Sequence, residues 1–269
     1  MPRRLTRLIV LILFLPIVTS GYLPDKRKEN AVSSSYEANV ASFSSQVFSM
    51  IKSEVSKPDY EVFKKALTGF LNLKADNNIK KNILTIVDFS LSSSLDRMWI
   101  IDMNKLEVVH TSLVAHGKNS GEEFASHFSN SPSSLQSSLG FFITGGTYTG
   151  KHGISLILDG VEPGINDNAR ERAIVMHGAD YVSRAFIRNN GRLGRSFGCP
   201  SIPLEDHDKI INLLSGRSCV YIHYPDSSYQ TMSRMFAKEG TLKGLYNYLN
   251  ERSGIFSSFY KIYSVSYNQ

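Results

Sequence analysis

The chain contains Met176-His177-Gly178-Ala179-Asp180 and, shortly after it, Gly194-Arg195-Ser196-Phe197-Gly198-Cys199-Pro200. A cysteine thiol is a strong nucleophile only as the thiolate, which a nearby imidazole generates or stabilises. A glycine follows His177 and another precedes Cys199, and glycine lets a substrate approach the backbone closely. If the imidazole and the thiol meet in space, these two stretches predict a cysteine acyltransferase or hydrolase.

The sequence around this pair has the pattern of a β-rich domain. Asn104-Lys105 predicts a tight turn, and residues 117–139 predict a long loop rich in serine and asparagine. Strands and helices do not alternate regularly, so we expect a mainly β (α+β) domain built as a β-sandwich or barrel. Short apolar runs bounded by turn residues predict strands at residues 83–89, 98–103, 106–115, 141–148, 152–158, 173–176 and 219–224.

Segments of a different pattern flank that domain. Between residues 36 and 82 apolar side chains recur at three- and four-residue steps, which indicates helices. Pro58 suits the first turn of the second of these helices. We therefore expect a helical appendage at 36–82, a catalytic domain at 83–226 that includes a helix at 204–214, and a C-terminal extension at 227–269.

The N-terminus has the pattern of a secretory signal. Three arginines precede an apolar run at 8–18, and small residues follow that run. The run is too short for a comfortable membrane-spanning helix, so we expect a signal peptide at 1–20 and a polar linker at 21–35. The expected location is the periplasm or cell envelope, with membrane attachment only if the signal stays uncleaved.

The composition disfavours several classes of protein. Hydrophobic residues make up 42% of the chain and charged residues 20%, as in folded globular proteins. The net charge of +6 is not gathered in a long lysine or arginine run, so no nucleic-acid partner is expected. The histidines and cysteines lack zinc-ligand spacing, and no phosphate-binding glycine motif follows a predicted strand. We therefore expect no metal and no cofactor.

The two cysteines of the chain, Cys199 and Cys219, could form a structural disulfide in an exported protein. Cys219, however, begins a predicted strand, whereas Cys199 lies in a loop rich in glycine, serine and proline. A buried, inert Cys219 and a reactive Cys199 fit this difference better than a disulfide does.

The motif formed by the two stretches resembles that of a known family. His177-Gly178 followed by Ser196-Phe197-Gly198-Cys199 resembles the signature of L,D-transpeptidases with a YkuD-type catalytic domain. Together with His116-Gly117, it is similar to the murein L,D-transpeptidase catalytic domain family, and the resemblance runs from about residue 83 to residue 225. The better-known pattern has histidine at Phe197, and a small aliphatic residue then Asn or Arg at Pro200-Ser201.

The resemblance implies a mechanism. Cys199, activated by His177, would attack the carbonyl between meso-diaminopimelate and D-alanine in a peptidoglycan tetrapeptide stem. An amine from a second stem would then resolve the thioester and give a 3→3 cross-link. The backbone N–H groups of Gly198 and Cys199 would stabilise the oxyanion. A backbone carbonyl often orients the histidine in this family, so no aspartate is required.

Residues near the pair have more than one interpretation. Ser196 and Gly178 are expected to shape the loops beside the two catalytic groups. Arg195 either binds a stem-peptide carboxylate or forms a structural ion pair. Tyr148 flanks a glycine-rich hairpin and either lines the cleft or ends a strand at the surface, whereas residues 170–172 are interpreted as a solvated turn.

Three alternatives stay open at this point. Water in place of the acceptor amine would make the protein an L,D-carboxypeptidase that acts on the same bond. A papain-like peptidase is disfavoured, because its cysteine precedes its histidine in the chain. A non-catalytic wall-binding protein that retains the fold is favoured only by the loss of the usual histidine at Phe197. The sequence indicates stem peptides as partners, but neither the acceptor amine nor the oligomeric state.

Overall fold

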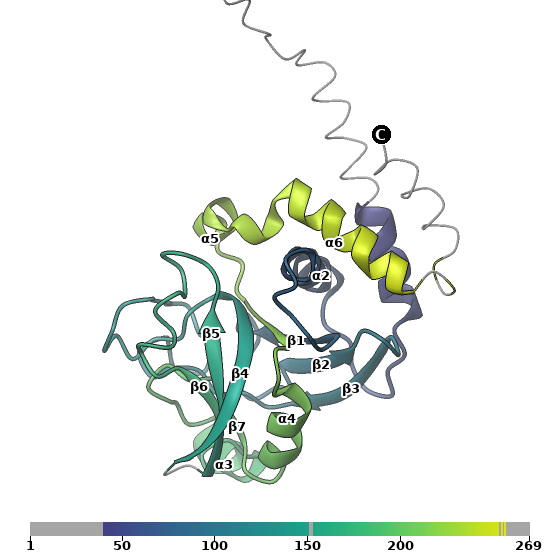
Figure 1. Ribbon diagram of the computed structural model, residues 1–269. Helices are drawn as coiled ribbons and strands as arrows, with labels where there is room; N and C mark the ends of the chain where they lie inside the picture. Colours follow the sequence, from purple (N-terminus) through teal and green to yellow (C-terminus); the bar gives the residue numbers. More distant parts are fainter. Residues whose placement is uncertain (1–39, 151–152, 253, 255, 257–269) are drawn as a thin grey trace, which may run out of the picture. The chain divides into compact units, whose positions relative to one another are not determined.

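The computed structural model describes residues 40–150, 153–252, 254 and 256. The predicted signal peptide (1–20) and linker (21–35) lie outside the described residues. The described chain forms a sheet with helices packed against it (Figure 1). No helix among these residues combines the length and the apolar character that crossing a membrane requires.

The named strands belong to a single eight-stranded sheet. Its order is β3-β2-β1-β8-β4-β5-β6-β7. Among these strands the pairing is parallel for β1 with β8 and for β6 with β7, and antiparallel elsewhere. The strands are β1 (Ile83–Asp88), β2 (Met98–Asp102), β3 (Glu107–Ser112), β4 (Gly140–Gly150), β5 (Gly153–Gly160), β6 (Val175–Ala179), β7 (Ser201–Pro203) and β8 (Cys219–His223).

The two edges of the sheet meet. The chain that follows β3 pairs with the start of β7: the Ala115 N–H donates to the Ser201 carbonyl at 2.8 Å, and the Ser201 N–H donates back at 3.3 Å. The Lys118 N–H then donates to the Ser196 carbonyl at 2.8 Å. These bonds nearly close the sheet into a barrel, which satisfies the edge groups that an open sheet would expose. The expected mainly β, barrel-like fold is confirmed.

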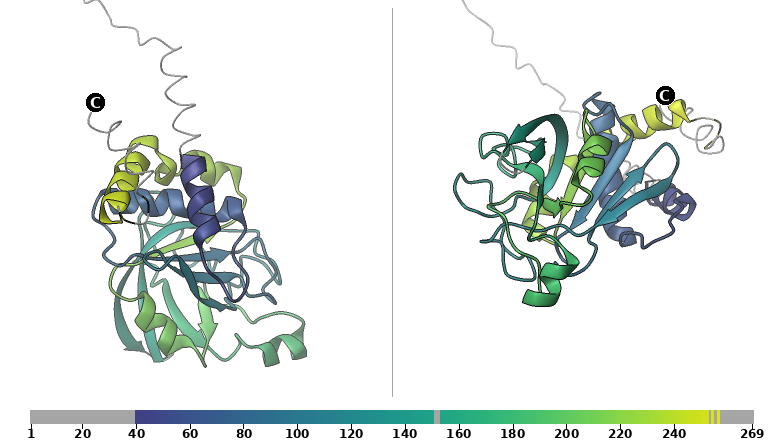
Figure 2. Two further views of the ribbon diagram at one scale, coloured as in Figure 1. Left: turned by 90° about the vertical axis from the view of Figure 1, so that its right-hand side faces the viewer. Right: turned by 90° about the horizontal axis from the view of Figure 1, so that it is seen from below.

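Helices lie on two sides of the sheet (Figure 2). Residues 40–50 are helical. The named helices are α2 (Tyr60–Ala75), α3 (Arg184–Asn190), α4 (His207–Leu214), α5 (Ser227–Met232), the short 3-10 helix η1 (Arg234–Phe236) and α6 (Lys238–Glu251). The prediction that Pro58 lies in the first turn of α2 is wrong, because the helix begins one residue after Asp59. The Asp59 carboxylate accepts hydrogen bonds from the backbone N–H groups of Glu61 and Val62, which fixes the start of the helix there.

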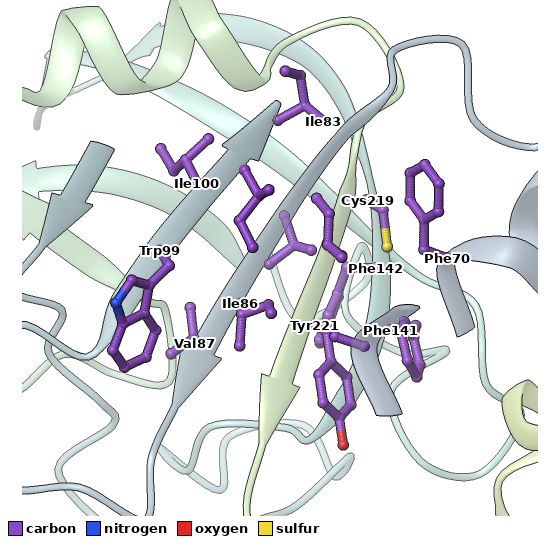
Figure 3. Packing of buried hydrophobic residues seen from close by; sticks show 14 of the residues in the cluster. Phe70, Ile83, Ile86, Val87, Trp99, Ile100, Phe141, Phe142, Cys219 and Tyr221 are labelled. Atoms are coloured by element: carbon purple, nitrogen blue, oxygen red, sulfur yellow. The ribbon is translucent and has the colours of Figure 1, made fainter. Parts of the chain in front are cut away.

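The sheet and all the named helices except α3 and η1 contribute buried residues to one large apolar core (Figure 3). Phe141 of β4 stacks on Tyr221 of β8 with ring centroids 4.4 Å apart. The Phe141 ring also lies against α2 at Gly69, where an added Cβ would come within 2.1 Å of the ring. A glycine at this point of the helix is therefore needed for close packing on the sheet. The predicted division between 36–82 and 83–226 stays a prediction.

A buried carboxylate ties the C-terminal part of the chain to the sheet. Glu162 accepts hydrogen bonds from the backbone N–H of Phe141 at 2.6 Å, from the Tyr229 hydroxyl at 3.2 Å and from the Ser233 hydroxyl. Burial raises the pKa of Glu162. Three donors on one buried acid offset much of its desolvation cost, so α5 and the chain that follows it are held against β4.

Candidate active site

A cavity of about 470 Å³ gathers most of the residues that the sequence singled out. Tyr148, Arg172, Ala173, Val175, His177, Tyr181, Arg195, Ser196, Phe197 and Cys199 line it. The thiol and the imidazole therefore open onto the same space, as the sequence motif predicts. Gly178 and Gly198 are not part of this lining.

Strand pairing places the two candidate catalytic groups. His177 lies on β6, and its register partner on the parallel strand β7 is Ser201. Cys199 lies two positions before Ser201, in the loop that leads into β7, so it comes beside the start of β6. There the Val175 N–H donates to the Cys199 Sγ at 3.5 Å. The predicted strand at 173–176 corresponds to β6, which begins later and includes His177.

The loop before Cys199 is held by side-chain hydroxyls. The Ser196 hydroxyl donates to the Cys199 carbonyl at 2.6 Å and accepts from the Gly198 N–H at 3.0 Å. The Ser137 hydroxyl donates to the Gly198 carbonyl at 3.1 Å. Gly198 has a φ of 123°, and an added Cβ would lie 2.8 Å from the Gln136 carbonyl, so only glycine fits.

These bonds change the expected oxyanion site. The N–H of Gly198 already donates to Ser196, so it is not available to a developing oxyanion. Among the described residues no group accepts from the N–H of Cys199. The backbone donor at Cys199 is therefore the stronger candidate of the predicted pair.

The thiol of Cys199 is in an environment that favours its neutral form. Its S–H donates to the Ala173 carbonyl at 3.7 Å, and its sulfur accepts from Val175. Burial raises the pKa of Cys199, while the Val175 N–H and the positive charge of Arg172 lower it. The net shift is upward, so a base is needed to generate the thiolate.

The hydrogen bonds of His177 define its tautomer. Its Nδ1 lies 2.9 Å from the Gly178 carbonyl, and its Nε2 lies 2.9 Å from the Ser201 hydroxyl. A carbonyl only accepts, so Nδ1 carries the proton and Nε2 accepts from Ser201. The backbone carbonyl of Gly178 thus orients the imidazole.

Arg172 is a candidate site residue that the sequence interpretation missed. Residues 170–172 were expected to form a solvated turn, but the Arg172 guanidinium turns inward. It donates to the Ser129 and Gln136 carbonyls, both at 2.7 Å, and to the Ser138 hydroxyl at 2.5 Å. Its positive charge lowers the pKa of Cys199. The side chain is recruited by the long loop 117–139, whose path the sequence does not reveal.

Arg195 and two aromatic residues form the more exposed wall. The Arg195 guanidinium pairs with Glu122 at 2.5 Å and donates to the Lys118 and Gly121 carbonyls, so the predicted structural ion pair is present. Tyr148 is 46% exposed and Phe197 is 67% exposed. The Lys118 ammonium lies 5.0 Å from the centre of the Phe197 ring.

A second histidine, His116, holds the loop that carries Cys199 through its backbone. The His116 carbonyl accepts from the Ser196 N–H at 2.9 Å. Its Nδ1 accepts from the Arg97 guanidinium at 2.8 Å, so its Nε2 carries the proton and donates to the Gly121 carbonyl at 3.3 Å. Burial, together with the charge of Arg97, lowers the pKa of His116 to about 4. Arg97 is itself fully buried and also donates to the Val114 carbonyl.

The two cysteines differ as the sequence predicts. Both are free thiols, so the disulfide alternative is wrong. Cys219 is fully buried at the start of β8, where burial raises its pKa, whereas Cys199 is half-buried and lines the cavity. Among the described residues no group of histidine, cysteine, aspartate and glutamate side chains is arranged to hold a metal ion.

Comparison with known proteins identifies the family. The model of the L,D-transpeptidase catalytic domain matches residues 54–223, which is more than half of the chain. The chain therefore belongs to the L,D-transpeptidase catalytic domain family, and Cys199 and His177 both lie within the matched residues. No curated protein sequence matches it.

Two solved structures resemble the chain at low similarity. The helical cell shape determining protein Pgp2 of Campylobacter jejuni, as a lysine-to-alanine mutant, has 11% sequence identity and a TM-score of 0.37, with 68% of this chain and 64% of that chain covered. A second Pgp2 structure has 11% identity and a TM-score of 0.36, with 66% and 62% covered. The chain thus matches less than two thirds of the length of Pgp2, and this similarity is too low to assign a function.

Proposed function

We propose that the protein is an exported peptidoglycan L,D-transpeptidase. Cys199 is its nucleophile and His177 its base, and the tetrapeptide stem is its acyl donor. The observation that carries the proposal is that the half-buried thiol and the oriented imidazole line one cavity in a member of this family. An exported location follows from the substrate and from the predicted signal at 1–20.

The acylation step follows from the hydrogen bonds of the site. The Cys199 sulfur bonds to the carbonyl carbon between meso-diaminopimelate and D-alanine, and its proton passes to Nε2 of His177. A hydroxyl can donate or accept by rotation, so Ser201 donates to the neutral imidazole and accepts from the protonated one. The Cys199 N–H stabilises the carbonyl oxygen. D-alanine then leaves with the proton, and a thioester remains.

The charged and aromatic residues that line the cavity are proposed to recognise the donor stem. A tetrapeptide stem carries carboxylates, and two arginines, Arg172 and the Glu122-paired Arg195, line the cavity that contains the thiol. Tyr148 and Phe197 offer exposed rings to the apolar parts of the stem. Phe197 stands where the better-known pattern has a histidine, so the donor meets an apolar surface there instead of an imidazole.

The decisive experiment incubates the purified protein with disaccharide-tetrapeptides and analyses the products by mass spectrometry. We expect dimers that lack one D-alanine, and a thioester adduct on Cys199. The Cys199→Ser variant should form neither, while Cys219→Ser, which leaves the cavity intact, should behave as wild type. Tripeptides without dimers would identify an L,D-carboxypeptidase. Unchanged substrate would contradict both enzymes and leave the wall-binding role.

A further inference from the structure

A second cavity adjoins the one that contains the thiol. Its volume is about 490 Å³. Gly153, Gly178, Ala179, Asp180, Tyr181, Leu204 and His207 line it. An added Cβ at Gly178 would lie 2.8 Å from the His207 ring, so the space on this side of β6 depends on the glycine. Tyr181 lines both cavities.

A chain of hydrogen bonds links Tyr181 to the catalytic imidazole. The Tyr181 hydroxyl lies 3.0 Å from the Ser201 hydroxyl, which lies 2.9 Å from Nε2 of His177. Nε2 carries no proton, so Ser201 donates to it and Tyr181 donates to Ser201. Each member is thus both positioned and polarised for transfer of a proton toward His177.

The two cavities differ in charge. Two arginines, Arg172 and Arg195, line the thiol cavity, and Arg195 is paired with Glu122. The second cavity has no lysine or arginine in its described lining, and it contains the exposed carboxylate of Asp180. Asp180 forms no ion pair with another described residue. A carboxylate-bearing donor therefore suits the first cavity, and an ammonium group suits the second.

We propose, on the basis of the function proposed above, that the second cavity binds the amine-bearing acceptor and that Tyr181 and Ser201 conduct its proton to His177. The acceptor arrives as an ammonium attracted to Asp180. The ammonium loses one proton to water and becomes a neutral amine. This amine then attacks the thioester beside Tyr181, which lines both cavities.

The transfer step balances as follows. The amine nitrogen bonds to the thioester carbon, and the carbon–sulfur bond breaks as the thiolate of Cys199 leaves. The remaining excess proton on nitrogen passes to the Tyr181 oxygen while Tyr181 gives its own proton to Ser201 and Ser201 gives its own to Nε2 of His177. The imidazolium then protonates the thiolate. The net change is thioester plus amine to amide plus thiol, with no further reactant.

The test separates aminolysis from hydrolysis. The acyl-enzyme is formed with disaccharide-tetrapeptide and then mixed with an isotope-labelled disaccharide-tripeptide, whose meso-diaminopimelate supplies the amine. Mass spectrometry gives the ratio of labelled dimer to hydrolysed donor. For Tyr181→Phe we expect this ratio to fall at least about 100-fold, since a positioned proton acceptor contributes about 10²- to 10⁴-fold. For Asp180→Asn we expect the tripeptide concentration at half-maximal aminolysis to rise about 10-fold.

The controls keep the test decisive. Glu205→Gln removes a neighbouring exposed carboxylate outside the cavity lining and should leave the ratio unchanged. An unchanged ratio in Tyr181→Phe, or an unchanged tripeptide dependence in Asp180→Asn, would overturn the acceptor site even though wild type forms dimers. A wild type that never forms the acyl-enzyme would overturn the proposed function, and the acceptor site with it.

Discussion

Two histidine–glycine pairs flank the loop that carries Cys199, and they support it in different ways. His177-Gly178 faces the cavity, and its Nε2 accepts from the neutral hydroxyl of Ser201. His116-Gly117 lies beneath the loop, and its Nδ1 accepts from the buried cation Arg97. A positive neighbour opposes protonation, whereas a hydroxyl can serve either protonation state. The same dipeptide therefore carries the proposed base in one place and a fixed support in the other.

The largest expected effect separates the two histidines by activity. In His177→Gln, acyl-enzyme formation should fall about 10²- to 10⁴-fold, because the group that accepts the thiol proton is lost. In His116→Gln the rate should stay at least about 10-fold higher than in His177→Gln, since an amide can still pair with Arg97. Intact-protein mass spectrometry after timed exposure to tetrapeptide measures both rates. Equal losses in two folded variants would contradict the division of roles.

The next effect concerns the cation beneath the loop. Arg97→Met should lower the free energy of unfolding by about 3–5 kcal/mol, because it leaves the buried Val114 carbonyl and the partly buried Leu91 carbonyl without their donors. Urea unfolding measures the change. The exposed ion pair of Arg184 with Asp96 offers a matched control, and Arg184→Met should cost less than about 1 kcal/mol. Similar losses in the two variants would contradict a special role for Arg97.

A smaller effect should appear in the pH dependence of stability. The pKa of His116 is lowered from 6.5 to about 4 by burial and by Arg97, so the native state binds fewer protons than the unfolded state between these values. The free energy of unfolding is therefore not reduced by this group above pH 6.5. It falls by about 3 kcal/mol as the pH is lowered from 6.5 to 4. Urea unfolding at both pH values, with His116→Gln as reference, measures it. A parallel pH dependence in the two proteins would contradict the assignment.

The smallest effect concerns Ser196, whose N–H binds the His116 carbonyl and whose hydroxyl shapes the loop. Ser196→Ala removes the bonds to Gly198 and Cys199, and the free energy of unfolding should fall by about 1–2 kcal/mol. Thermal unfolding measures this loss, and Ser126→Ala, which lacks contacts with this loop among the described residues, is the control. A cost in Ser196→Ala no larger than in Ser126→Ala would show that the loop is held without the hydroxyl.

The sequence predicted the β-rich fold, and it singled out Cys199 and His177, which line one cavity, because strand patterning and the motif are local signals. It did not predict β7, which is only three residues long, or the closure of the sheet through Ala115 and Ser201. Neither did it predict the inward turn of Arg172. These features depend on contacts between distant segments, which no local pattern of side chains specifies.

The sequence contained part of the information needed to predict the contacts of Ser201 and Tyr181. Ser201 occupies the position at which the better-known motif has Asn or Arg, so a polar partner for the imidazole could have been expected there. Its link to Tyr181 could not, since it requires the register of β6 against β7.

The buried carboxylate of Glu162 has a practical consequence for anyone who trims this protein. The family match ends at residue 223, but Tyr229 and Ser233, which donate to Glu162, come after it. A fragment that ends at residue 223 would retain Glu162 but lose two of the three groups that donate hydrogen bonds to its carboxylate. Expression of the catalytic part alone should therefore extend at least through η1, to Phe236.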